Sequence, residues 1–169
     1  QIYWRILNMV DRILDKASKE NEIHKIDLEI NKLAFFVQRN LSGKFSNNSK
    51  NFLLYEEAAT LESLGDFLRS FKIYSSLNEN DKEFLNKFYE IIDSLKAEIS
   101  TFEHFLEIKK KINALQTLVE KLKKKDKNNS ILASILLLKN LKQLFEVKFT
   151  LNIQKLNLVS KDNRFEKDL

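Results

Sequence analysis

The feature that most limits the fold of this 169-residue chain is its lack of proline; it also has only two glycines, Gly43 and Gly65. At the usual frequency, a chain of this length would contain about eight prolines. Proline breaks helices by removing a backbone donor, and glycine weakens them. A chain poor in both can form long helices, whereas β-sandwiches and barrels need many turn residues. The sequence therefore predicts an all-α fold.

Length, cysteine content and charge narrow the class of protein further. The chain is long enough for one domain with a substantial core, and we expect residues 1–169 to form a single helical bundle. The absence of cysteine excludes a disulfide scaffold and a thiol nucleophile. The net charge of +5, from 29 basic and 24 acidic residues, indicates a mixed surface. Such a surface permits an acidic partner without requiring one.

Apolar residues recur at helical spacing over the first 40 residues or so. This pattern predicts one helix from Ile2 to about Ser18 and a second from about Glu22 to Asn40. The stretch "LSGKFSNNSKN", residues 41–51, predicts a loop, with Gly43 as the helix stop. The expected buried positions of the two helices are Ile2, Ile6, Met9, Ile13, Ala17, Ile23, Ile26, Ile30, Leu33 and Val37.

A third helix is expected to start near Asn51 and to end before a short polar joint, "SSLNEND". Gly65 lies inside this helix, where it predicts a bend or a close approach by a neighbour. After the joint, Asn80 and Glu83 have the spacing of an N-cap and its reciprocal partner. The expected buried face of the third helix is Leu54, Ala58, Leu61, Leu64, Leu68 and Phe71.

A single pattern of apolar residues at helical spacing then continues from Phe84 to Leu122. A single helix of that length would be roughly 60 Å long at 1.5 Å per residue. Ser100 and Glu103 match a capping box, so we expect a break near Ser100. The expected buried positions on the two sides of this break are Phe84, Phe88, Ile91, Leu95, Ile99, Phe102, Leu106, Ile112, Leu115, Leu118 and Leu122.

The last helix is expected from Ile131 to about Val159, with Asn129 or Ser130 as its cap. It is apolar around most of its circumference, which requires neighbours on several sides. We therefore predict a bundle of five to six helices with a central, largely buried C-terminal helix that encloses Leu141 and Phe145. Residues 160–169 are charged and are expected to fray. The polar strip of this helix is Lys139, Gln143, Glu146, Thr150 and Gln154.

The sequence contains no catalytic signature around its two histidines, His24 and His104. HExxH, GxxxxGK[ST], GxGxxG and GxSxG patterns are absent, and no glutamate precedes a histidine by three residues. Glu103 and Glu107 flank His104, but a metal site needs several ligands at defined spacing. We interpret both histidines as solvated or rim residues, and we expect no cofactor, no metal and no enzymatic activity.

Lysines cluster near the predicted end of the segment before the last helix. Lysines at a helix C-terminus complement the helix dipole and keep an exposed turn soluble. Alternatively, the same residues form an anion-binding patch for a glycosaminoglycan, a nucleic acid or an acidic protein surface. These candidate partner-binding residues are Lys121, Lys123, Lys124, Lys125 and Lys127, and a smaller group comprises Lys109, Lys110 and Lys111.

Most of the thirteen phenylalanines fall on the apolar stripes, so we interpret them as core residues. Phe35 and Phe36 are adjacent, so at most one of them can point squarely inward. The other is a candidate contact for a partner, and Trp4 is a similar candidate. The alternative is that these side chains are exposed without a role.

Two stretches carry a resemblance to a known family. The first is "KIYSSLNENDKEFLNKFYEIIDSL", in which Tyr74, Ser75, Ser76, Leu77 and Asn78 form a helix end and joint. The second is "ILASILLLKNLKQLFEVKFTLNIQKLN" near the C-terminus. The first resembles the helix end and joint, and the second the late helix, of the paralogous Borrelia surface lipoproteins that include the complement regulator-acquiring surface protein. Over the N-terminal part of the chain the likeness is confined to helical character.

The resemblance implies an all-helical lipoprotein on the outer surface of the cell, tethered by an N-terminal cysteine. The sequence starts at Gln1 rather than methionine, so we expect a targeting segment or lipid-bearing cysteine to precede it. The resemblance also implies a non-enzymatic role in immune evasion through binding of a host protein, with complement regulators as the best-known class of partner. Residues alone leave open an intracellular helical scaffold or a nucleic-acid-associated protein. They also leave the oligomeric state open.

Overall fold

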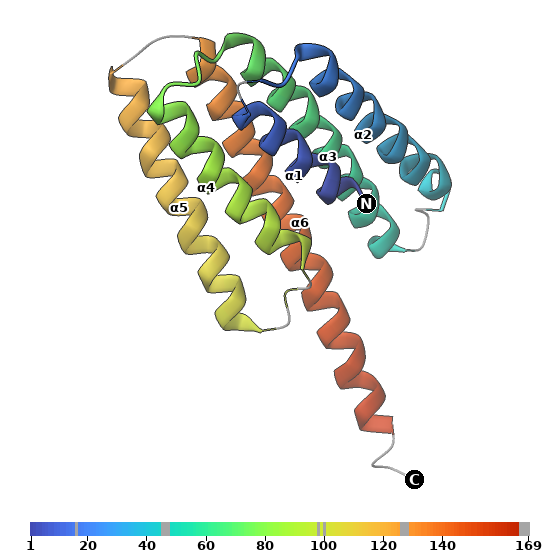
Figure 1. Ribbon diagram of the computed structural model, residues 1–169. Coiled ribbons are helices and arrows are strands. Elements are labelled where there is room, and N and C mark those ends of the chain that lie inside the picture. Colours follow the sequence, from blue (N-terminus) through green and yellow to red (C-terminus); the bar gives the residue numbers. More distant parts are fainter. Residues whose placement is uncertain (16, 45–47, 98, 100, 126–128, 166–169) are drawn as a thin grey trace.

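The described residues of the computed structural model form six helices and contain no strand, so the predicted all-α class and helix number are confirmed (Figure 1). The structure describes residues 1–15, 17–44, 48–97, 99, 101–125 and 129–165, and for 125, 129 and 154–165 it describes the backbone only. The helices are α1 (Ile2–Leu14), α2 (Glu20–Leu41), α3 (Ser49–Tyr74), α4 (Glu79–Lys96), α5 (Phe102–Lys125) and α6 (Asn129–Phe165).

The helices pack as two groups of three around one connected core. In the first group α1, α2 and α3 contact one another, and in the second α4, α5 and α6 do. Contacts between α3 and α6 and between α1 and α4 join the groups. α2 and α5 therefore lie at opposite edges of the bundle, and each exposes a long outer face (Figure 1).

α6 is the helix that the sequence predicts to be central, and its burial agrees. It packs against α3, α4 and α5. Leu141 is fully enclosed and Phe145 is 8% exposed, while the described members of the polar strip face solvent. The Gln154 side chain lies outside the described part of the chain.

The predicted ends of α6 need correction. The helix continues to Phe165 rather than ending near Val159, and its C-terminal part extends past the other helices (Figure 1). It begins at Asn129, so Asn129 and Ser130 lie in its first turn; the side chain of Asn129 is outside the described part of the chain, and the predicted cap stays a prediction. Residues 166–169, the end of the segment expected to fray, lie outside the described residues.

The predicted break between the fourth and fifth helices is present, but the apolar phase does not continue across it. α4 ends at Lys96 and α5 begins at Phe102, where the Thr101 hydroxyl oxygen accepts from the His104 N–H at 3.1 Å. Ser100, the predicted cap, is not among the described residues. The break resets the rotation of the helix, so Phe102 and Leu106 are exposed instead of buried. The buried positions of α5 are Phe105, Ile108, Ile112, Leu115 and Val119.

The joint between α3 and α4 is capped two residues earlier than predicted. The Asn78 side chain accepts from the Asp81 N–H at 3.0 Å, and Asp81 Oδ2 accepts from the Asn78 N–H at 3.3 Å. Asp81 also accepts from the Ser75 hydroxyl at 2.8 Å, which anchors the end of α3 to the start of α4. This buried carboxylate accepts from the N-cap backbone of α4 and from the Ser75 hydroxyl just after α3, whereas Asn80 and Glu83 are exposed.

The remaining boundaries follow the sequence closely. α1 ends at Leu14, so Ala17 and Ser18 fall in the turn that follows, and α2 begins at Glu20. Gly43, just beyond the end of α2, has φ +82°, the left-handed conformation of a glycine helix stop. Gly65 serves close packing, because an added Cβ would lie 3.2 Å from Ile30 Cδ1 on α2. Among the described residues, no helix is long and apolar enough to cross a membrane.

Candidate functional site

The outer face of α2 carries apolar and basic residues in alternation. The opposite face buries Ile23, Ile30 and Ala34 against the bundle, which leaves the outer positions without a neighbouring helix. We call this outer row the α2 stripe; its members are Lys25, Leu28, Lys32, Phe35 and Arg39, all exposed and spaced alternately three and four residues apart. That spacing keeps side chains on one side of a helix.

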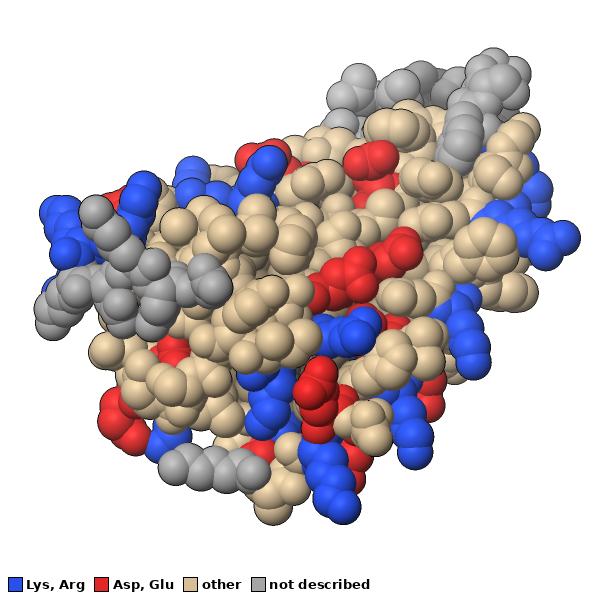
Figure 2. Space-filling view, turned by 90° about the horizontal axis from the view of Figure 1, so that it is seen from above, with Lys and Arg blue, Asp and Glu red and all other residues tan. Residues whose placement is uncertain are grey.

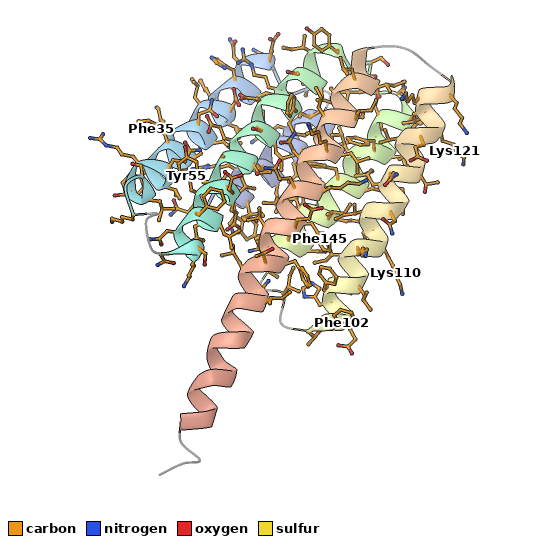
Figure 3. The ribbon with its side chains drawn as sticks, turned by 180° about the vertical axis from the view of Figure 1, so that it is seen from behind. Phe35, Tyr55, Phe102, Lys110, Lys121 and Phe145 are labelled. Carbon is orange, nitrogen blue, oxygen red and sulfur yellow. The ribbon has the colours of Figure 1, made fainter. Side chains whose placement is uncertain are left out.

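Two large rings on this face are open to solvent. Phe35 is 62% exposed and its neighbour Phe36 is 67% exposed. Figure 3 shows Phe35 on the outer side of α2. The sequence allowed one of the pair to point inward, but neither does, because Ala34, Leu33 and Val37 occupy the positions that face the bundle.

The α2 stripe has an excess of positive charge. In the described part of the chain, no ion pair involves Lys25, Lys32 or Arg39. Glu29, the neighbouring acid on the α1 side, pairs with Arg5 at 3.0 Å. The stripe thus presents unpaired cations beside apolar side chains.

A groove of about 430 Å³ opens between α1, α2 and α3. This volume is in the range of small-molecule sites, which are typically about 300–1,000 Å³. Phe36 stands at its α2 side, and Glu57 is the charged residue in its lining. The lining residues are Gln1, Ile2, Tyr3, Leu33, Phe36, Val37, Leu54, Glu57, Ala58 and Leu61.

A polar triad of Tyr3, Glu57 and Lys148 lies at the border of this groove, which Tyr3 and Glu57 line. The Tyr3 hydroxyl donates to Glu57 Oε1 at 2.7 Å, and Lys148 Nζ lies 3.5 Å from the same oxygen. Burial raises the pKa of Tyr3 far above its usual value, and the charge of Glu57 and its hydrogen bond raise this pKa further. Tyr3 therefore stays protonated and keeps donating to Glu57.

A second cavity, of about 210 Å³, adjoins the groove and shares Leu54 and Glu57 with it. Its lining also includes Lys50, Lys96 and Lys148. Three lysines and one glutamate line this cavity, so positive charges exceed negative ones. We call this cavity the lysine pocket.

Lys96 connects the lysine pocket to the only tryptophan of the chain. Its Nζ lies 3.7 Å from the centroid of the Trp4 ring, a cation–π contact, and 2.6 Å from Asp93 Oδ1. Trp4 is 62% exposed, so this predicted candidate for a partner contact lies beside the pocket at the surface.

The predicted lysine group lies on α5, at the opposite edge from the α2 stripe. Lys121, Lys123 and Lys124 are exposed, and Figure 3 shows Lys110 and Lys121 on the outer side of α5, away from Phe35. The side chain of Lys125 and the whole of Lys127 lie outside the described residues. On the face seen in Figure 2, basic side chains are interspersed with acidic and uncharged ones.

Buried polar groups also lie along the seam between α2 and α3. Asp27 is buried and pairs with Arg69 at 3.4 Å. Burial raises the pKa of Asp27, as does the nearby Asp66, while Arg69 and His24 act in the opposite direction. Within the described residues, no three His, Asp, Glu or Cys side chains are close enough to hold a metal ion.

Sequence reasoning identified Phe35, Phe36 and Trp4 but missed the groove and its polar triad. Tyr3, Glu57 and Lys148 lie on three helices that are far apart in the chain, so no local pattern connects them. The α2 stripe does have a local signal, because its members alternate in type at helical spacing.

Comparisons of this chain with protein-family models, with curated proteins and with solved structures returned no match.

Proposed function

We propose that this chain is the helical domain of a non-enzymatic, lipid-anchored outer-surface protein that binds a host protein through the α2 stripe. The resemblance to the Borrelia surface lipoproteins supports the location, the anchor and the class of partner. Complement regulators are the first candidates within that class, and immune evasion is the role that such binding would serve.

The exposure of Phe35 and Leu28 is the observation that carries the binding mode. Large aromatic side chains are enriched in the centres of protein interfaces, and an exposed apolar patch with a polar rim is typical of an interaction site. Here Phe35 and Leu28 lie among Lys25, Lys32 and Arg39. Apolar anchors would supply affinity, and the cations would select the partner.

The spacing of the α2 stripe favours a helical or extended partner segment with apolar and acidic residues. Side chains at alternating three- and four-residue spacing pack into a neighbouring helix as ridges into grooves. Acidic residues on the partner would meet cations that lack an ion pair within the described chain. Association would then be fast at low salt and slower at high salt.

The test is surface plasmon resonance against purified host serum proteins, complement regulators among them. We expect one of them to bind, and we expect the double variant Leu28→Ser/Phe35→Ser, which changes both apolar members of the stripe, to weaken that binding at least tenfold. Leu132→Ser is the matched control, because Leu132 is equally exposed on α6, outside the α2 stripe. Equal loss in both variants, or none in the double variant, would exclude the α2 stripe as the site.

Polyanion binding by the α5 lysines is the second candidate function. Lys121, Lys123 and Lys124 are exposed and, in the described chain, belong to no ion pair. Replacement of Lys121, Lys123, Lys124, Lys125 and Lys127 by Gln should abolish retention on a heparin column if this function holds. Unchanged retention would show that the lysines only solubilise a helix end.

An intracellular scaffold or nucleic-acid-associated role would instead require a chain whose upstream codons encode no signal peptide.

A further inference from the structure

We propose that the groove and the lysine pocket together form a binding site for a long-chain carboxylate, with the alkyl tail in the groove and the carboxylate at Lys50 and Lys96. This activity is separate from partner binding by the α2 stripe. It rests on three observations: an apolar cavity of sufficient size, a cationic cavity that shares two lining residues with it, and a polar triad that determines where the charge lies.

The groove suits an alkyl chain. Apart from Glu57, Gln1 and the Tyr3 hydroxyl, its lining consists of aliphatic and aromatic carbon. Polar side chains would be needed along the cavity to recognise a sugar or a nucleotide, and the groove does not provide them. Each methylene that leaves water for such a surface tightens binding by about fourfold.

The lysine pocket suits the head group. Lys148 and Tyr3 both contact Glu57 Oε1, so the only acid in the pocket already has its partners. Lys50 and Lys96 also line the pocket and do not contact Glu57 within the described ion pairs. Lys96 pairs with Asp93 three residues earlier on the same helix, but Asp93 is exposed, so this pair is weakened by solvent and can yield to a bound anion.

The shared wall of the two cavities gives the ligand its orientation. Leu54 and Glu57 line both cavities, so a molecule that spans them would have its tail among apolar side chains and its head among lysines. A ligand with a cationic head would meet like charge at Lys50 and Lys96. The site should therefore distinguish an anionic head from a cationic one on the same tail.

The probe is dodecanoate below its micelle concentration, titrated by calorimetry into the intact chain. We expect saturable binding with one site, at least tenfold weaker binding of hexanoate, and at least tenfold weaker binding of dodecyltrimethylammonium. Because Trp4 is the only tryptophan and stacks under Lys96, dodecanoate should also change the tryptophan emission. No saturable binding, or equal affinity for the cationic probe, would overturn the proposal.

Variants locate the two ends of the ligand. The double variant Lys50→Gln/Lys96→Gln should bind dodecanoate about tenfold more weakly. The double variant Lys121→Gln/Lys123→Gln on α5 should leave the affinity for dodecanoate unchanged. Val37→Glu places a carboxylate in the groove and should abolish binding. Phe35→Ser should have no effect, because Phe35 does not line the groove. Unchanged affinity in the Lys50/Lys96 variant would exclude the lysine pocket, whatever the α2 stripe binds.

Discussion

α2 and α6 carry similar apolar side chains but place them in opposite environments. α6 packs against three helices, and Phe145 on it is 8% exposed. α2 packs against α1 and α3 at the edge of the bundle, and Phe35 on it is 62% exposed. The number of neighbouring helices, rather than the residue type, decides whether a phenylalanine stabilises the fold or remains available to a partner.

The sharpest test of this contrast is Phe145→Ala, which we expect to lower the free energy of unfolding by about 3–5 kcal/mol. Phe145 stacks on Phe105 of α5 with ring centroids 4.7 Å apart, and Phe105 in turn stacks on Phe149 at 4.0 Å. The substitution leaves a cavity and removes one ring from this cluster. Urea denaturation measures the change; a loss below about 1 kcal/mol would show that α6 is not central.

A smaller effect is expected where α2 meets the bundle. Gly65→Leu should destabilise the protein by about 1–3 kcal/mol, because a side chain at this position must displace Ile30. Thermal unfolding measures the loss. The second substitution Ile30→Ala should then cost less in the Gly65→Leu background than alone, since it frees the space that Leu needs. Additive effects of the two substitutions would mean that the helices are not in close contact there.

The inner face of α2 should also give stability a pH dependence. The raised pKa of Asp27 means that the folded state binds a proton more readily than the unfolded state, so this group contributes stability at low pH that is lost as pH rises through the raised value. Asp27→Asn removes this titration. The free energy of unfolding of the variant should therefore rise relative to that of the wild type as the pH rises from about 4 to 7.

This comparison is made by urea denaturation across that pH range. Asp93→Asn, at an exposed position of α4, is the control for the loss of a carboxylate as such. A difference between Asp27→Asn and the wild type that stays constant with pH would show that the carboxyl titrates normally. A difference that moves in favour of the wild type as the pH rises would show that folding lowers the pKa of Asp27 instead of raising it.

The smallest effect on stability is expected at Phe35. Phe35→Ser should change the free energy of unfolding by no more than about 0.5 kcal/mol, because the ring is mostly in water in both states. Urea denaturation of this variant and of Phe145→Ala compares the loss of stability at an exposed phenylalanine with the loss at a buried one. A loss above about 1.5 kcal/mol would mean that Phe35 belongs to the core, and the α2 stripe would lose its main anchor.

Helical periodicity, with capping and turn signals, predicted five to six helices and most core positions, because burial in a bundle repeats with the helix. It failed at the breaks. Phe102 and Leu106 were assigned to the core on the assumption that one phase continues past residue 100, but the turn rotates α5 relative to α4. The cap at Asn78 was missed because Asn80 has similar local chemistry. Only the position of Asp81, which accepts from both Ser75 and Asn78, distinguishes them.

The candidate sites were predictable only where their signal is local. Exposed aromatics and lysine runs can be read along the chain. The Tyr3–Glu57 hydrogen bond joins residues 54 positions apart, and Lys148 comes from yet another helix. Cavities between helices depend on how three surfaces meet, and a single sequence does not contain that information in any one segment.

The central position of α6 has a consequence for the order in which the chain acquires structure during synthesis. When the first five helices have left the ribosome, α3 still lacks α6, one of the three helices on which it packs. α4 and α5 lie between α3 and α6 in the chain, so this contact forms late. Until α6 emerges, α3 and α5 expose the apolar faces that it will cover. The nascent chain should therefore remain loosely structured and accessible to chaperones, and the native bundle should form only after the sixth helix has been translated.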